Sequence, residues 1–136
     1  MKYHIDSVVM AEQSLLGALM QEPEKLVEVK ATVDPEDFYD ERNKDIYSAI
    51  LRLDEMEIIP DTTTIFEEIN NSGAFRTVDA SLYIVDLYDI TPSSRNIMHD
   101  ANLVKRYSIY REIREALLNS TEEMNQGNAD IDSLTA

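Results

Sequence analysis

Apolar side chains recur at three- and four-residue spacing along most of this chain, which is the pattern of amphipathic helices. The periodicity predicts helices over residues 7–20, 24–33, 41–56, 61–73, 81–88 and 94–124. Residues 34–39 are expected to form a single helical turn that places Phe38 and Tyr39 in the core. The run 81–88 is short and rich in Tyr, Ile and Val, so its periodicity also allows a strand. The predicted fold class is all-α.

Polar residues and glycine mark several of the expected helix ends. Ser7 is a candidate N-cap for the first helix, and Asp61 or Thr62 is a candidate for the helix that follows Pro60. Gly73 stands where a helix favours a left-handed terminal residue.

The expected helix over residues 94–124 is the longest element, because no Gly or Pro interrupts it. At about 45 Å it is too long for a compact core, so it projects from the globular body or packs against a partner. Gly127 is expected to stop this helix, and residues 130–136 are expected to open another. The predicted organisation is a globular multi-helix head over residues 1–90, followed over 91–136 by a long helix and the start of a truncated helical hairpin.

The composition is that of a folded protein with little capacity to bind DNA. Hydrophobic residues make up 43% of the chain and charged residues 29%, with only 3 Gly and 4 Pro. The net charge of -15 is spread along the chain, so direct binding to duplex DNA is not expected. Absence of cysteine excludes disulfides, and no apolar run approaches the roughly 20 residues of a membrane span. A cytoplasmic protein without a membrane segment is expected.

No sequence motif indicates catalysis, a cofactor or a metal. The chain has no GxxxxGK[ST] loop, its three glycines are isolated, and its two histidines lack metal-ligand spacing. Carboxylate pairs such as Asp37 with Asp40 are expected on solvated faces, and a small carboxylate enzyme has only the abundance of acids in its favour. Four cations lie within ten positions of the long helix: Lys105, Arg106, Arg111 and Arg114. They indicate either a protein contact or intrahelical pairing, such as Arg111 with Glu115, and the pattern leaves both open.

Several segments, taken in order, resemble the N-terminal domain of DnaB-type replicative helicases. Residues 11–17 (AEQSLLG) are similar to the opening AEQxxLG of that family, and residues 37–39 (DFY), followed by Ile46 and Tyr47, are similar to its next conserved stretch. The remaining matches are Pro60-Asp61 with Thr64, Leu82-Tyr83-Ile84 with Leu87, Thr91-Pro92-Ser93-Ser94 with Asn96-Ile97, and Arg111. Met10 replaces an expected Glu, Asn43 an expected His, and residues 78–80 (VDA) an expected VGG, which indicates a divergent bacterial or phage-encoded member.

The resemblance implies a non-catalytic domain that binds other proteins. In that family a helical head and hairpin assemble as a trimer of dimers into a collar on a hexameric ring, which receives primase and, as a further candidate partner, a helicase loader. ATP and Mg²⁺ belong to a RecA-like C-terminal domain, so the resemblance implies no cofactor for this chain. The candidate surface for the hairpin and self-association is Val104, Tyr107, Tyr110, Ile113 and Leu117. The candidate partner contacts are Tyr83, Arg111 and Arg114.

A DNA-binding regulator is the alternative, with residues 61–73 as part of a helix-turn-helix. Charge weighs against it, because this segment contains Asp61, Glu67 and Glu68 and no Lys or Arg occurs until Arg76.

Overall fold

The computed structural model describes residues 3–73, 80–92 and 96–135, and within these ranges it contains helices and no strand. The elements are α1 (Ile5–Gln21), η1 (Pro23–Lys25), α2 (Leu26–Lys30), η2 (Pro35–Asp37), α3 (Glu41–Glu55), α4 (Thr62–Ser72), α5 (Ala80–Ile90) and α6 (Ile97–Thr135), where η is a 3-10 helix. The all-α prediction is confirmed, and the ambiguous run at 81–88 is part of a helix.

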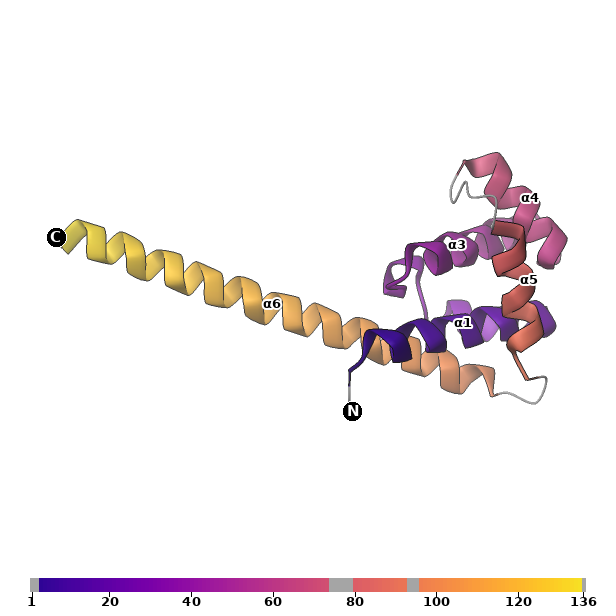
Figure 1. Ribbon diagram of the computed structural model, residues 1–136, viewed down its shortest axis with the longest axis horizontal. Coiled ribbons are helices and arrows are strands. Elements are labelled where there is room, and N and C mark those ends of the chain that lie inside the picture. The colour runs from indigo at the N-terminus through magenta and orange to yellow at the C-terminus, as the bar shows by residue number, and fades with distance from the viewer. Residues whose placement is uncertain (1–2, 74–79, 93–95, 136) are drawn as a thin grey trace.

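The helices form a head from which α6 extends (Figure 1). Helices α1 to α5 and the first turns of α6 make up the head, and the part of α6 after Ser108, here called the stalk, continues beyond it. At 39 residues, α6 is about 58 Å long. The start of α6 is inside the head, so the head continues past residue 90. The predicted division of the chain into two parts at that residue stays a prediction.

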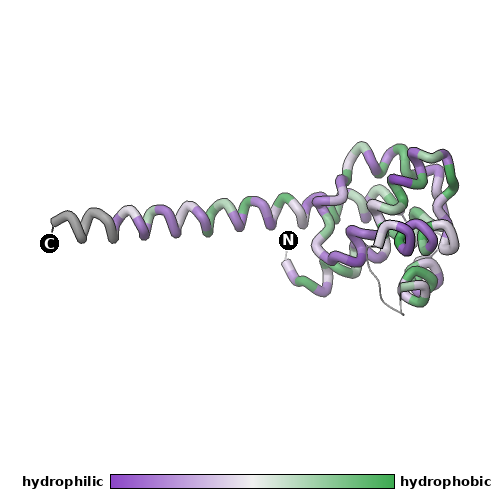
Figure 2. The backbone as a smooth tube through the Cα atoms, turned by 90° about the horizontal axis from the view of Figure 1, so that it is seen from above, coloured by the Kyte–Doolittle hydropathy of each residue, from purple (hydrophilic) through white to green (hydrophobic). Residues whose placement is uncertain are grey.

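Helix α1 lies at the centre of the head and contacts α3, α5 and α6. Its buried face includes Leu15, Leu16 and Leu19, which are fully buried against residues such as Ile46 and Ile84. Burying each such side chain contributes about 1.5–3 kcal/mol, so this central helix supplies much of the energy that holds the head together. Figure 2 shows hydrophobic residues throughout the head and at intervals along the stalk.

Of the two N-cap candidates for α4, Asp61 is the cap, Thr62 is the first helical residue, and the predicted end at Gly73 is confirmed. The Asp61 side chain accepts a hydrogen bond from the backbone amide of Thr64 at 2.8 Å, and the Thr64 hydroxyl accepts one from the amide of Asp61 at 2.9 Å. Gly73 ends the helix with φ 75°, the left-handed conformation that glycine adopts without strain.

Three other expectations differ from the structure. Helix α1 begins at Ile5 with His4 in the N-cap position, so Ser7 is not the cap and lies in the first turn. The helix expected over residues 24–33 is divided into η1 and α2. The turn η2 forms as predicted and buries Phe38 against Tyr47, with ring centroids 4.9 Å apart, but Tyr39 is 43% exposed.

Helix α6 does not stop at Gly127, so the predicted break is wrong. Residues 130–135 continue the same helix rather than opening a new one, and Ala136 lies outside the described residues. A single glycine inside a helix costs about 1 kcal/mol relative to alanine, which is too little to end a long helix without a neighbouring proline or a cap. The second helix of a hairpin stays a prediction. Among the described helices, none is both long and apolar enough to cross a membrane.

Candidate protein-interaction surface

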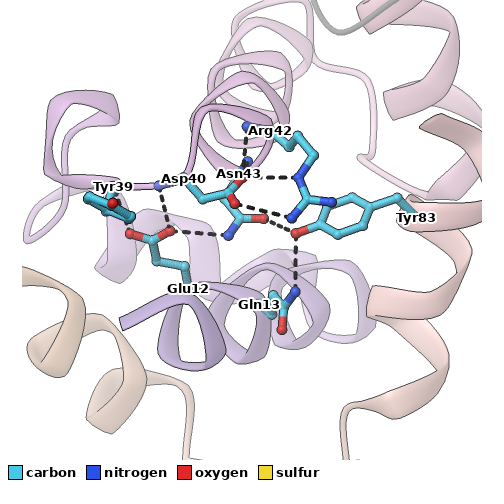
Figure 3. A network of polar contacts seen from close by, with 7 residues as sticks. All are labelled: Glu12, Gln13, Tyr39, Asp40, Arg42, Asn43 and Tyr83. Atoms are coloured by element: carbon cyan, nitrogen blue, oxygen red, sulfur yellow. Dashed lines mark hydrogen bonds and ion pairs between the residues drawn. The ribbon is translucent and has the colours of Figure 1, made fainter. Parts of the chain in front are cut away.

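A buried carboxylate, Glu12, joins α1 to the start of α3 (Figure 3). It accepts hydrogen bonds from the backbone amides of Tyr39 at 2.6 Å and Asp40 at 3.1 Å, and from the side-chain amide of Asn43 at 3.1 Å. Asp40 caps α3 by accepting from the amides of Arg42 and Asn43. The network therefore fixes the chain between η2 and α3 against α1, which explains why a charged residue stands on the apolar face of α1.

Burial raises the pKa of Glu12, because removal from water penalises the charged form. The hydrogen bonds from Tyr39, Asn43 and Asp40 act in the opposite direction and limit the rise. Glu12 is thus a structural acid held among its own chain's donors. The sequence held one signal for it, since Glu12 is four residues after Val8 and three before Leu15, on the face that becomes buried.

Tyr83, a predicted partner contact, belongs to the same network. Its hydroxyl donates to the side-chain oxygen of Asn43 and accepts from Gln13 at 3.3 Å. The guanidinium of Arg42 lies over its ring, 4.3 Å from the centroid. Tyr83 is therefore half-buried and engaged by its own chain through three side chains, and a role in partner binding stays a prediction.

Asp37 connects the head to α6, contrary to the expectation that it is solvated. Only 4% of Asp37 is exposed, and its carboxylate accepts hydrogen bonds from Lys105 at 3.1 Å and from the Ser108 hydroxyl at 2.7 Å. Arg111 donates to the backbone oxygen of the same residue at 2.7 Å. Burial opposes ionisation of Asp37, but hydrogen bonds from the Asp34 amide, Ser108 and Lys105 outweigh it and lower the pKa of the carboxyl. Lys105, Ser108 and Arg111 are spaced three residues apart on α6. Their contacts with Asp37 fix the direction in which the stalk leaves the head.

The basic cluster of the long helix divides into two groups. Lys105 and Arg111 contact Asp37 of the same chain. The sequence had suggested either a contact with another protein or pairing within the helix, and this contact with η2 is neither. Arg106 and Arg114 are exposed. Arg114 borders a depression beside residues 3–6, and it is the member of the predicted partner contacts that is most accessible.

The predicted self-association residues lie in two environments. Val104 is 1% exposed and Tyr107 is 6% exposed, so these two are core residues of the head and not part of a free surface. Tyr110, Ile113 and Leu117 are exposed on the stalk. Helices α1 and η2 pack on the first turns of α6, and these contacts end near Ser108. The apolar stripe is therefore buried before this residue and exposed after it.

The exposed stripe includes more residues than the predicted self-association surface. Leu118 and Met124 also belong to it, and both are more than half exposed. An open hollow of about 320 Å³ lies along it, lined by Tyr110, Ile113, Arg114, Leu117, Leu118 and Thr121. At the base of the stalk the ring of Tyr3 stacks on Tyr110 at 4.7 Å, a contact that the sequence did not reveal because the two residues are far apart along the chain.

Comparison with known proteins identifies the family. The family model for the DnaB-like helicase N terminal domain matches residues 6–106, which is most of the chain. The chain belongs to this family. It is 31% identical over 102 residues to the replicative DNA helicase DnaB of Rhodothermus marinus, covering 75% of this chain and 11% of that protein. It is also 31% identical over 103 residues to the replicative DNA helicase DnaC of Bacillus subtilis (strain 168), covering 76% of this chain and 23% of that protein. The chain thus spans less than a quarter of the length of these relatives.

Solved structures of DnaB N-terminal domains have the same fold. The N-terminal domain of DnaB helicase from Mycobacterium tuberculosis superposes with a TM-score of 0.82 at 26% identity, covering 88% of this chain and 85% of that one. The N-terminal domain of DnaB helicase from Helicobacter pylori superposes with a TM-score of 0.74, covering 92% of this chain and 99% of that one. At 20% identity, the second comparison shows the fold alone.

Two of the segments that resemble the DnaB family contain acidic residues that hold helices together. Glu12 binds the start of α3, and Asp37 binds α6. Asn43, where the resemblance led us to expect His, is buried between Glu12 and Tyr83, and Met10, where it led us to expect Glu, is exposed. Val78 and Asp79 lie outside the described residues.

Proposed function

We propose that this chain acts as the non-catalytic N-terminal collar domain of a replicative DNA helicase, in which the stalk joins copies of the chain. The observation that carries the proposal is the apolar stripe on the stalk, which the head leaves exposed. ATP hydrolysis and strand translocation are assigned to another part of the full-length helicase. The bacterial relatives favour a bacterial cytoplasm as the site of action.

The spacing of the stripe suits helix-on-helix packing. Tyr110, Leu117 and Met124 are seven residues apart, and Ile113 falls between the first two at the spacing of a coiled-coil seam. Each of these side chains contributes about 1.5–3 kcal/mol when fully buried. Because the side chains are already partly covered by their own helix, the stripe of each copy supplies several kcal/mol, which offsets part of the roughly 4–15 kcal/mol of entropy lost on association.

Sedimentation velocity of the purified chain tests this proposal. We expect concentration-dependent self-association, and we expect Ile113→Glu combined with Leu117→Glu to shift the chain to monomer, because two carboxylates would face the apolar seam. Ile90→Glu is the matched control, since Ile90 is 65% exposed on the head and Leu117 is 64% exposed on the stalk. Far-UV circular dichroism should show the same helix content in all three proteins. A double variant that associates as strongly as the unchanged chain would contradict the proposed role of the stalk.

Primase is the proposed heterologous partner. The structure of the Helicobacter pylori DnaB N-terminal domain was described together with the interactions of that domain with primase, and the domain has the fold described here. Arg114, exposed at the junction of head and stalk, is the most accessible candidate contact. Isothermal titration calorimetry with the primase of the same genome is expected to detect binding, and Arg114→Ala is expected to weaken it. Absence of heat at high protein concentration would remove primase from the proposal.

The alternative, a DNA-binding regulator, is not favoured. Helix α4 carries Glu67 and Glu68, and Glu68 pairs with Arg52 at 2.7 Å. This helix has no Lys or Arg of its own to contact phosphates.

A further inference from the structure

A second exposed apolar site lies at the end of the head opposite the stalk. Helix α1 runs from beside the stalk to that end (Figure 1), where the α3–α4 connection passes next to η1. The site, here called the distal hollow, measures about 320 Å³ and is lined by Pro23, Glu24, Asp54, Glu57, Ile58, Ile59 and Pro60. Ile59 is 70% exposed, and its neighbours Met56 and Ile58 are about half exposed. Ile58 and Ile59 line the hollow and Met56 is close to them in sequence, and clustered exposed apolar side chains mark a contact surface more often than scattered single ones do.

The connection that carries these side chains is structured. The amide of Ile58 donates to the oxygen of Leu53 at 2.9 Å, and the amide of Glu57 donates to that of Asp54 at 3.0 Å. This is the hydrogen bonding of a helix end that normally has glycine in the left-handed position. Here Glu57 occupies that position, with φ 58°. Glycine would adopt this backbone conformation without strain, so Glu57 lowers the stability of the folded chain at this point.

The charge around the hollow is negative. Glu24, Asp54 and Glu57 are the ionisable residues among those that line it, and Glu55 and Asp61 flank the connection. Two cations lie nearby. The ammonium of Lys30 pairs with Asp54 at 2.9 Å, and that of Lys25, which follows Glu24 in η1, lies 4.0 Å from Glu28. An apolar floor with an acidic rim complements an apolar side chain flanked by cations. A second copy of this chain would bring the same negative charge to the hollow, which opposes self-association at this site.

We infer that the distal hollow docks a segment of another protein in which large apolar side chains are flanked by lysine or arginine. Ile59 supplies the apolar contact, and Glu24 and Glu57 orient the cations at the rim. The site is separate from the stalk, so the inference does not depend on self-association.

The probe for this site is a synthetic amphipathic peptide with leucine on one face and lysine on the other. A peptide with glutamate in place of lysine is the control. In ¹H–¹⁵N spectra of the full chain we expect the lysine peptide to shift the backbone amides of Glu24 and of residues 54–59, and the glutamate peptide to leave them unchanged. Ile59→Ser is expected to weaken binding about tenfold, because a large apolar contact is lost. Ile90→Ser is the matched control, since Ile90 is 65% exposed on the same head, and binding should be unchanged.

Glu57→Gly tests the contribution of a rim carboxylate to binding without destabilising the fold. It removes one carboxylate of the rim while giving the backbone its preferred residue, so binding is expected to weaken about twofold in a chain that remains folded. The inference is overturned if the amide shifts spread evenly over the acidic surface, or if Ile59→Ser binds the lysine peptide as tightly as the unchanged chain. It is also overturned if Ile59→Ser changes the sedimentation of the chain alone, because the hollow would then be a contact between copies.

Discussion

Replacing Gly17 by alanine tests how closely α1 approaches the end of α5. A Cβ atom at residue 17 would lie 1.9 Å from the Thr91 hydroxyl oxygen, 2.3 Å from the backbone oxygen of Leu87 and 2.8 Å from the Thr91 Cβ. Thr91 is itself buried, and its hydroxyl donates to the Leu87 oxygen at 2.8 Å. The Gln21 side chain also donates to the backbone oxygens of Tyr88 and Thr91, at 2.9 and 2.7 Å. The end of α5 is therefore fixed to α1, and it cannot move away without breaking these contacts.

The net effect is the difference between two terms. Overpacking of a filled core costs about 1–3 kcal/mol, and contact with a backbone oxygen places this case at the upper end or beyond it. Alanine in a helix returns about 1 kcal/mol relative to glycine. We therefore expect Gly17→Ala to lower the free energy of unfolding by about 2 kcal/mol. Gly127→Ala is the matched control, because a Cβ there has no neighbouring atom within 4 Å, and it should stabilise the stalk helix by up to about 1 kcal/mol.

Urea denaturation followed by far-UV circular dichroism measures both variants. If Gly17→Ala proves as stable as the unchanged chain, the close packing of α1 on α5 is wrong. If Gly127→Ala loses helix content, the continuity of α6 through that residue is wrong.

Three further variants test individual charges in the head. Asp37→Asn should lower the free energy of unfolding at neutral pH by about 1–3 kcal/mol, because the pair with Lys105 is lost, and partial exposure of Lys105 keeps the effect in this range. Because the pKa of Asp37 is lowered in the folded chain, its stabilisation is present above the ordinary value of 3.8 and is lost as pH falls through the lowered pKa, so denaturation of this variant and the unchanged chain should converge in acid. Burial raises the pKa of Glu12, so the stability linked to its protonation is present below the ordinary value of 4.5 and is lost as pH rises through the raised pKa. Urea titrations over this range should show that loss in the unchanged chain and not in Glu12→Gln, and identical pH profiles would contradict burial of the charge. Glu57→Gly should raise the thermal midpoint, by an amount equivalent to about 1 kcal/mol, and a lower midpoint would mean that the left-handed backbone at this residue is wrong.

Local signals in the sequence determined the elements whose ends are fixed by neighbouring residues. Asp61 and Thr64 form a reciprocal cap three residues apart, and Gly73 adopts the left-handed conformation that ends α4. These interactions need no distant partner, so the pattern alone limited the start of α4 to Asp61 or Thr62 and placed its end at Gly73. Gly127 shows the limit of such signals, because the cost of one glycine is smaller than the combined preference of the helix around it.

Burial along α6 was decided by tertiary structure. Val104, Tyr107, Tyr110 and Ile113 belong to one periodic stripe, and nothing in their spacing separates the first two from the last two. The separation comes from η2 and α1, which cover α6 only as far as Asp37 can reach Lys105 and Ser108.

The roles of the acidic residues could not be read from the sequence for the same reason. With 27 Asp and Glu in the chain, Asp37 differs from the solvated carboxylates only in what folds over it, and Glu12 differs from them in sequence only by its place on the apolar face of α1. A helix determines which side chains share a face, because that depends on spacing along the chain. Which faces are buried, and which carboxylates gain donors there, depends on contacts between residues far apart in sequence, and only the packed head supplies them.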